Sequence, residues 1–142
     1  MISESISAEF CCNIKYVWQT VTSLTEYSWR SEVKNIVVSP DKRRFEEYTK
    51  DGFVTRFKIT KFKPYDSYEF EIENDNLTGY WRGKFIFRNG CTFVNFTEEV
   101  SAKKFYIKPF LRMYVKSRQK IYIADLKRVL KRYENIKGKK QK

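Results

Sequence analysis

Residues 67–100 read SYEFEIENDNLTGYWRGKFIFRNGCTFVNFTEEV and carry the clearest pattern in the chain. Apolar and charged residues alternate through this segment, as they do in a strand with one buried face. Asn74-Asp75-Asn76 and Asn89-Gly90 interrupt the alternation, and residues of these types tolerate the positive φ of tight turns between antiparallel strands. The segment therefore predicts three consecutive antiparallel strands, over 67–73, 77–88 and 91–101.

The same pattern continues toward the N-terminus. Further turn signals occur at Ser39-Pro40-Asp41, Asp51-Gly52 and Pro64-Tyr65-Asp66. The apolar runs between them predict strands over 33–39, 43–50 and 53–63. Connections this short leave no room for crossover helices, so we expect an antiparallel meander. Ile2 to Phe10 alternates weakly and is a candidate seventh strand.

Helical spacing appears on both sides of the meander. Asn13 suits the cap of a helix that carries Ile14, Val17 and Trp18 on one face, and residues 25–30 resemble a second short helix. Pro109 suits the first turn of a long helix that runs to about Glu134. The apolar stripe expected on this long helix consists of Leu111, Val115, Tyr122, Leu126, Val129, Leu130 and Tyr133.

The composition excludes several classes of chemistry. The 142 residues contain no histidine, which rules out Ser-His-Asp and Cys-His catalysis and any His-ligated metal site. We expect no cofactor and no metal. The three cysteines, Cys11, Cys12 and Cys91, are odd in number, and we expect structural thiols rather than a disulfide framework. The N-terminus lacks the features of a signal peptide, so we expect a cytoplasmic protein.

The net charge of +12 is concentrated at one end of the chain. Residues 1–102 hold 14 Lys and Arg against 15 Asp and Glu, whereas residues 103–142 hold 15 against two. A solvated outer helix face is the commonest reason for such a pattern. Weak contact with an anionic membrane through the basic helix is the second interpretation. Nucleic-acid binding ranks third and is disfavoured, because the apolar stripe of the helix is committed to packing on the sheet and no stacking motif accompanies the basic run.

The order of elements, β-αα-β6-α, resembles the helix-grip fold of the START and polyketide-cyclase (SRPBCC) superfamily. Val17-Trp18, Tyr27 and Trp29 resemble its early aromatic segment, with Ser28 where the family often has proline. Its last two strands are similar to three segments here: Gly79-Tyr80-Trp81-Arg82-Gly83, Asn89-Gly90-Cys91-Thr92 and Thr97-Glu98-Glu99-Val100.

The resemblance implies an α+β domain over residues 1–136, in which a curved antiparallel sheet of six to seven strands wraps around the long C-terminal helix. Residues 137–142 would form a basic, disordered tail. Family members bind lipids, sterols, polyketides, plant hormones or flavonoids, and some are cyclases, aromatases or hydrolases. The fold therefore suggests a class of ligand without specifying a reaction.

Strand alternation and helix spacing together select the side chains that would line a cavity between sheet and helix. The apolar and aromatic candidates are Trp29, Phe57, Phe70, Trp81, Phe85, Phe96, Val115 and Tyr122. The same residues would equally make a solid core, and the pattern does not separate a filled interior from a hollow one.

Three polar residues share these inward-facing patterns. Gln119 lies within the apolar stripe of the long helix, where it either orients a ligand or bonds to Tyr122, a strand or buried water. Glu98 follows the period of Phe96, so it is a candidate ligand contact and the one candidate general acid or base. A solvated position at the sheet rim is the more frequent outcome for such a charge. Glu47 raises the same alternatives.

These observations favour a non-catalytic protein that binds a small hydrophobic or aromatic ligand, oriented by Gln119, Tyr122 and Glu98. The alternative is an enzyme similar to polyketide cyclases or aromatases, with acid–base chemistry that uses neither histidine nor metal. The third alternative is interaction with an anionic membrane or a nucleic acid through the basic helix. The chain would be a monomer or a homodimer.

Overall fold

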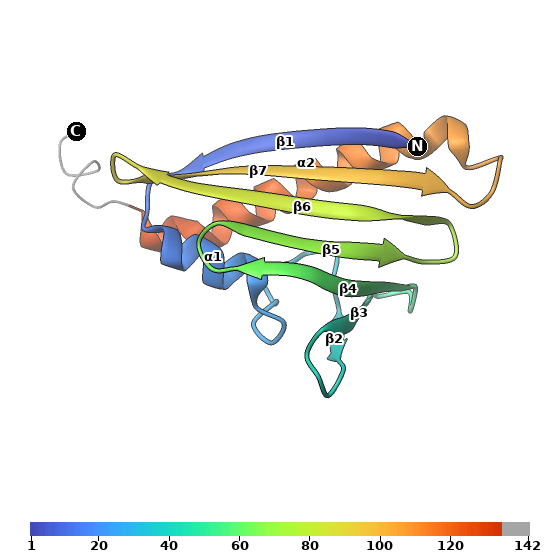
Figure 1. Ribbon diagram of the computed structural model, residues 1–142, viewed down its shortest axis with the longest axis horizontal. Coiled ribbons are helices and arrows are strands. Elements are labelled where there is room, and N and C mark those ends of the chain that lie inside the picture. The colour runs from blue at the N-terminus through green and yellow to red at the C-terminus, as the bar shows by residue number, and fades with distance from the viewer. Residues whose placement is uncertain (135–142) are drawn as a thin grey trace.

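Seven strands form one antiparallel sheet in the computed structural model, which describes residues 1–134 (Figure 1). Two α-helices and two short 3-10 helices accompany the sheet within these residues. The elements in chain order are β1 (Ile2–Phe10), α1 (Ile14–Thr22), β2 (Asn35–Val38), β3 (Arg44–Tyr48), β4 (Val54–Lys63), β5 (Ser67–Glu73), β6 (Leu77–Arg88), β7 (Cys91–Ala102), η1 (Lys108–Phe110), α2 (Leu111–Leu130) and η2 (Lys131–Tyr133).

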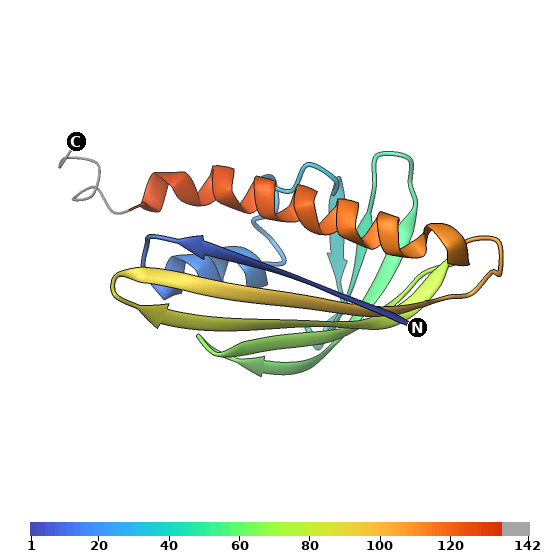
Figure 2. The same ribbon diagram turned by 90° about the horizontal axis from the view of Figure 1, so that it is seen from above.

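The strand order across the sheet is β1-β7-β6-β5-β4-β3-β2. Only the placement of β1 beside β7 departs from a simple meander, and it brings the N-terminal strand to the edge next to the last one. The sheet curves, and α2 runs along its concave side (Figure 2). This is the helix-grip α+β architecture that the order of elements predicted, with seven strands.

The strands match their predicted bounds to within two residues. The reason is that turn residues with positive φ mark their ends: Gly52 has φ of 83°, and Asn89 and Gly90 have φ of 54° and 80°. A two-residue turn with positive φ at both positions matches the twist of a hairpin. The Asn-Gly signal therefore fixed the β6–β7 hairpin correctly.

Helix α1 begins where the sequence predicts. The second short helix predicted after it does not form. The Asn13 side chain caps α1 by accepting a hydrogen bond from the Lys15 backbone at 2.9 Å. Residues 25–30 form turns rather than a helix. The Ser23 hydroxyl accepts a hydrogen bond from the Glu26 backbone N–H at 2.9 Å, which stabilises an irregular turn there.

The long helix follows the sequence pattern closely. Pro109 lies in η1, directly before α2, and the chain continues through η2 to Tyr133. Most of the expected stripe is in the core, including Leu111, Leu126 and Leu130, and Gln119 is buried with it. None of the helices in residues 1–134 is long and apolar enough to cross a membrane.

The expectation that all cysteines are free thiols is wrong. The sulfurs of Cys11 and Cys91 form a disulfide, and Cys12 is the free, buried cysteine. The register of β1 and β7 pairs Phe10 with Thr92. Cys11, which follows Phe10, therefore lies beside Cys91, which precedes Thr92. Spacing along the chain cannot reveal this pairing, because it depends on which strands become neighbours. The boundary expected at residue 136 and the tail 137–142 lie outside the described residues.

Candidate functional site

A cavity of about 100 Å³ lies between the concave face of the sheet and α2. Aromatic rings from the five adjacent strands β3 to β7 line its floor, and α2 and the segment after α1 close it from the other side. The interior is therefore hollow rather than completely filled. Its size approaches the roughly 150 Å³ of an engineered apolar cavity that accepts benzene.

The floor of the cavity is a continuous set of packed rings. Phe70 and Trp81 stack with ring centroids 4.8 Å apart, and Phe57 meets Phe70 edge-on at 5.2 Å. Phe96 contacts Trp81 on one side and Tyr122 of α2 on the other. These contacts hold each ring in place. The cavity wall is therefore rigid and suited to flat apolar ligands.

Most of the residues expected in the cavity line it. They are Phe57, Phe70, Trp81, Phe96, Glu98, Gln119 and Tyr122.

Three expected residues lie elsewhere, each for a packing reason. The Trp29 ring packs behind Tyr122 at 5.4 Å, and its indole N–H donates to the Glu26 carbonyl. Phe85 lies near the end of β6, where it packs against Trp18 of α1 at 4.9 Å. Val115 is fully buried in the core and is not part of the cavity wall.

Glu98 lies on the cavity wall rather than at a solvated rim. Strand alternation in β7 directs it inward beside Phe96, and the carboxylate accepts no hydrogen bond from the described residues. Burial raises its pKa to about 7, and the charge of Glu47 adds to this increase, while nearby Arg118 opposes it. The carboxyl is therefore close to half protonated at neutral pH.

Two phenols of the cavity share this lack of protein partners. The hydroxyls of Tyr68 and Tyr122 make no hydrogen bond to the described part of the chain. Burial raises the pKa of both, so both stay protonated and can donate a hydrogen bond. Together with Glu98 they give the aromatic cavity three polar groups that are available to a ligand.

Arg30 and Glu47 form a two-pronged ion pair on the same wall. The guanidinium donates to both carboxylate oxygens, at 3.2 and 3.3 Å, and lies over the Tyr122 ring at 4.9 Å from its centroid. Burial opposes the charge of Arg30, but Glu47 outweighs this effect and raises the pKa of Arg30. Glu47 was a candidate from its strand period. Arg30 was missed, because it follows a turn that has no periodicity.

Arg118 is the second cation that the sequence analysis missed. It donates to the Tyr114 hydroxyl at 2.9 Å and pairs with Glu32 at 3.5 Å. Burial opposes its charge, but Tyr114, Glu32 and Glu98 together raise its pKa above the usual value. Its place on α2, one turn before Tyr122, is the signal that would have found it.

Gln119 is satisfied by the protein itself. Its side-chain amide donates to the backbone carbonyl of Glu4 at 2.9 Å, which joins α2 to β1. Bonding to a strand residue was one of the alternatives for this side chain. Gln119 also lines the cavity, so its position there depends on this bond to the edge strand.

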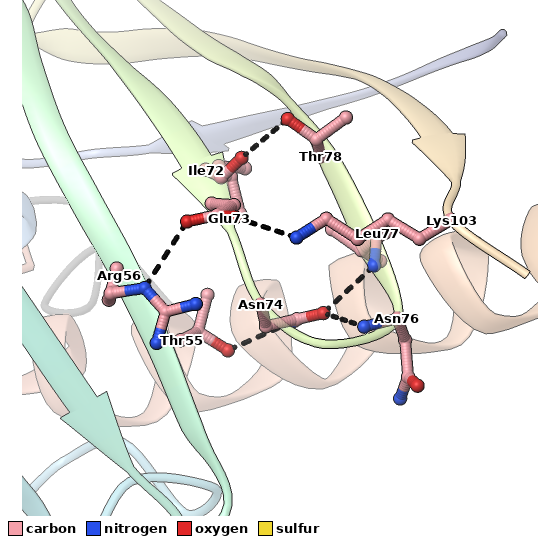
Figure 3. Close-up of polar contacts among 9 residues, drawn as sticks. All are labelled: Thr55, Arg56, Ile72, Glu73, Asn74, Asn76, Leu77, Thr78 and Lys103. Atoms are coloured by element: carbon pink, nitrogen blue, oxygen red, sulfur yellow. Dashed lines mark hydrogen bonds and ion pairs between the residues drawn. The ribbon is translucent and has the colours of Figure 1, made fainter.

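Asn74 lines the cavity from the turn between β5 and β6, where several hydrogen bonds hold it (Figure 3). Its side-chain oxygen accepts hydrogen bonds from the backbone N–H groups of Asn76 and Leu77, and its amide donates to Thr55 at 3.2 Å. Outside this turn, Glu73 pairs with Arg56 and Lys103. These bonds make the β5–β6 turn a fixed part of the cavity wall.

The comparisons with known proteins agree on the fold and on nothing more specific. Neither a protein-family model nor a curated protein matches the chain. Many solved structures superpose over nearly all of it, and three of them serve as examples. A conserved protein from Geobacillus kaustophilus has a TM-score of 0.79 at 11% identity and covers 94% of this chain and 98% of its own.

The other two structures belong to proteins with more specific names. A START superfamily protein from Mycobacterium smegmatis has a TM-score of 0.78 at 12% identity, with 92% of this chain and 97% of its own covered. The Aha1 dimer from Colwellia psychrerythraea has a TM-score of 0.68 at 13% identity, with 89% and 94% covered. The chain therefore has the START-like helix-grip fold, as the resemblance of its motifs implied. The fold alone does not specify a function or a ligand.

Proposed function

We propose that the protein binds a small hydrophobic or aromatic ligand that carries a hydroxyl or carbonyl group, in the cavity between the sheet and α2. The observation that supports this most strongly is the presence of Glu98, Tyr68 and Tyr122 beside the aromatic floor of the cavity, each without a hydrogen bond to the described residues. No fully buried side-chain nitrogen or oxygen of the described residues lacks a partner, so these three groups reach the open space of the cavity. A ligand hydroxyl would bond to them there, while the rings take up its apolar body.

The first test asks whether a molecule is retained. Native mass spectrometry of freshly purified protein should show a discrete mass above the 17.2 kDa chain. The second test measures binding of naphthol by its own fluorescence. Naphthol has a flat aromatic body and one hydroxyl, and we expect it to bind more tightly than naphthalene by about tenfold or more, as one hydrogen bond to a charged group contributes.

A matched pair of variants locates the bound naphthol. Ile36 and Val38 are half-buried neighbours on the same face of β2, and only Ile36 lines the cavity. Ile36→Trp should block binding, whereas Val38→Trp should retain it. Equal binding by both variants would place the naphthol outside the cavity and would contradict the proposal.

An acid–base enzyme is the second candidate, and Glu98 is the observation that favours it. A carboxyl with a pKa of about 7 can both accept and donate a proton near neutral pH. A cyclase- or aromatase-like reaction would convert a linear polyketone into an aromatic product with a new absorbance band. Glu98→Gln should then abolish turnover and retain ligand binding. Unchanged turnover in this variant would remove the enzyme hypothesis.

A further inference from the structure

The connection from β7 to α2 lies at one tip of the molecule (Figures 1 and 2). This connection and the start of α2 carry several exposed apolar side chains. Phe105 is 87% exposed and Met113 is 66% exposed, although both are strongly apolar. Contiguous exposed surfaces of this kind mark interaction sites. The cluster consists of Phe105, Tyr106, Phe110, Met113 and Tyr114.

The helical turn at the start of α2 explains how these side chains converge. Phe110, Met113 and Tyr114 are spaced three and four residues apart, so they lie on one helix face. Tyr106 comes from the preceding loop and joins Phe110 and Tyr114 around a surface pocket of about 310 Å³. The Phe105 ring packs edge-on against Tyr106, with centroids 5.7 Å apart.

This surface pocket adjoins the ligand cavity. Asn74, Leu77 and Tyr114 line both spaces and form the wall between them. Asn74 is fixed by its turn, whereas Tyr114 is exposed on one side and bonds to Arg118 on the other. The exposed cluster therefore lies at the end of the cavity where α2 begins.

Every charged residue within the segment that carries the cluster is positive. Residues 103–116 contain four Lys and one Arg and no Asp or Glu. Lys103 pairs with Glu73, and Arg112 and Lys116 pair with Glu4. Lys108 is exposed and has no ion-pair partner among the described residues. Aromatic rings and methionine are thus flanked by cations in a single projecting segment.

We propose that residues 103–116 form a docking surface for an anionic lipid bilayer. Aromatic side chains settle at the level of the headgroups, and flanking cations bind the negative surface. A second copy of the chain would bring two surfaces of net positive charge together and is disfavoured. A nucleic acid would leave the apolar side chains in water. The inference goes beyond the proposed ligand and places the membrane at one end of its cavity.

The test is sedimentation of the full chain with vesicles of phosphatidylcholine alone or with added phosphatidylserine. We expect binding only to the mixed vesicles, and weaker binding as salt is added. Phe105→Ser and Phe110→Ser should each reduce the partition coefficient about tenfold. Lys108→Ala should reduce it about fivefold, which corresponds to one cation near a charged surface.

Phe87→Ser is the matched control, because Phe87 is an exposed phenylalanine near the opposite end of β6. It should bind as tightly as the unchanged chain. Three results would overturn the proposal: no binding to mixed vesicles, an equal loss for Phe87→Ser, or a dimer dispersed by Phe105→Ser without any vesicle binding. None of these results bears on naphthol binding, because Phe105, Lys108 and Phe110 do not line the cavity.

Discussion

The carboxylate of Asp125 accepts two hydrogen bonds from Ser31, one from the backbone N–H and one from the hydroxyl, both at 2.8 Å. Its other oxygen accepts a hydrogen bond from Arg128 at 2.8 Å. Asp125 is buried on α2, and Ser31 lies in the irregular segment between α1 and β2. This contact therefore ties that segment, which carries Arg30, to the helix.

Removal of the Asp125 carboxylate should be costly. Asp125→Ala leaves a backbone N–H without a partner and should lower the free energy of unfolding by about 3 kcal/mol. Ser31→Ala removes only the hydroxyl and should cost about 1 kcal/mol. Urea unfolding monitored by tryptophan fluorescence measures both values. Equal effects for the two variants would mean that the backbone hydrogen bond contributes nothing.

Glu98 should make the protein less stable as pH rises. Its pKa of about 7 in the folded chain exceeds the ordinary value of 4.5, so the folded state binds more protons between these values. The free energy of unfolding should then fall across this window, by up to about 3 kcal/mol in total. Glu98→Gln should remove this contribution to the slope. A Glu98→Gln chain whose unfolding midpoint follows the same pH dependence as the unchanged chain would contradict the burial of this carboxyl.

Two glycines should respond very differently to alanine. A Cβ at Gly79 of β6 would collide with the Glu99 carbonyl oxygen and with the Val100 side chain on β7. Gly79→Ala should therefore cost about 3 kcal/mol. Gly52 has φ of 83° but no atom within 4 Å of its Cβ position, so Gly52→Ala should cost about 1 kcal/mol. Chemical denaturation of both variants gives the comparison, and a larger loss at Gly52 would reverse it.

A count of the free thiols tests whether the disulfide forms. Under denaturing conditions without reductant, one thiol should react with Ellman's reagent, and all three cysteines should react after reduction. Because the bond closes a long loop, reduction should lower the free energy of unfolding by about 2–4 kcal/mol. Cys12→Ser should leave no reactive thiol before reduction. Three reactive thiols in the unreduced chain would show that the bond does not form.

Local patterns predicted the strands well because each one carries its own evidence. The alternation of Tyr68 and Phe70 with charged residues identifies a half-buried strand, and Asn89-Gly90 marks a hairpin, without reference to distant parts of the chain. The second short helix does not form because Glu26 bonds to Ser23, and Ser31, which follows the segment, bonds to Asp125 far along the chain. Helix propensity is a local property and takes no account of contacts between residues that lie far apart in the sequence.

The site could be predicted only where a residue breaks a pattern. Glu98 and Gln119 are polar residues in apolar series, and this made them visible. Arg118 looked like one more cation on a basic helix, and Arg30 lies in a turn. Both become part of the cavity only through partners on other elements, Glu32 and Glu47. The disulfide depended in the same way on which strands become neighbours.

Gln119 joins α2 to one margin of the sheet, and this bears on how the proposed ligand cavity could widen. Gln119 fastens α2 to β1, at one margin, while β2 forms the opposite margin and pairs with a strand on one side only. Expansion of the cavity would then come from outward bending of β2 and β3, while β1 and α2 stay in place. Homologous proteins that bind bulkier ligands should differ from this chain most in the length of β2 and β3.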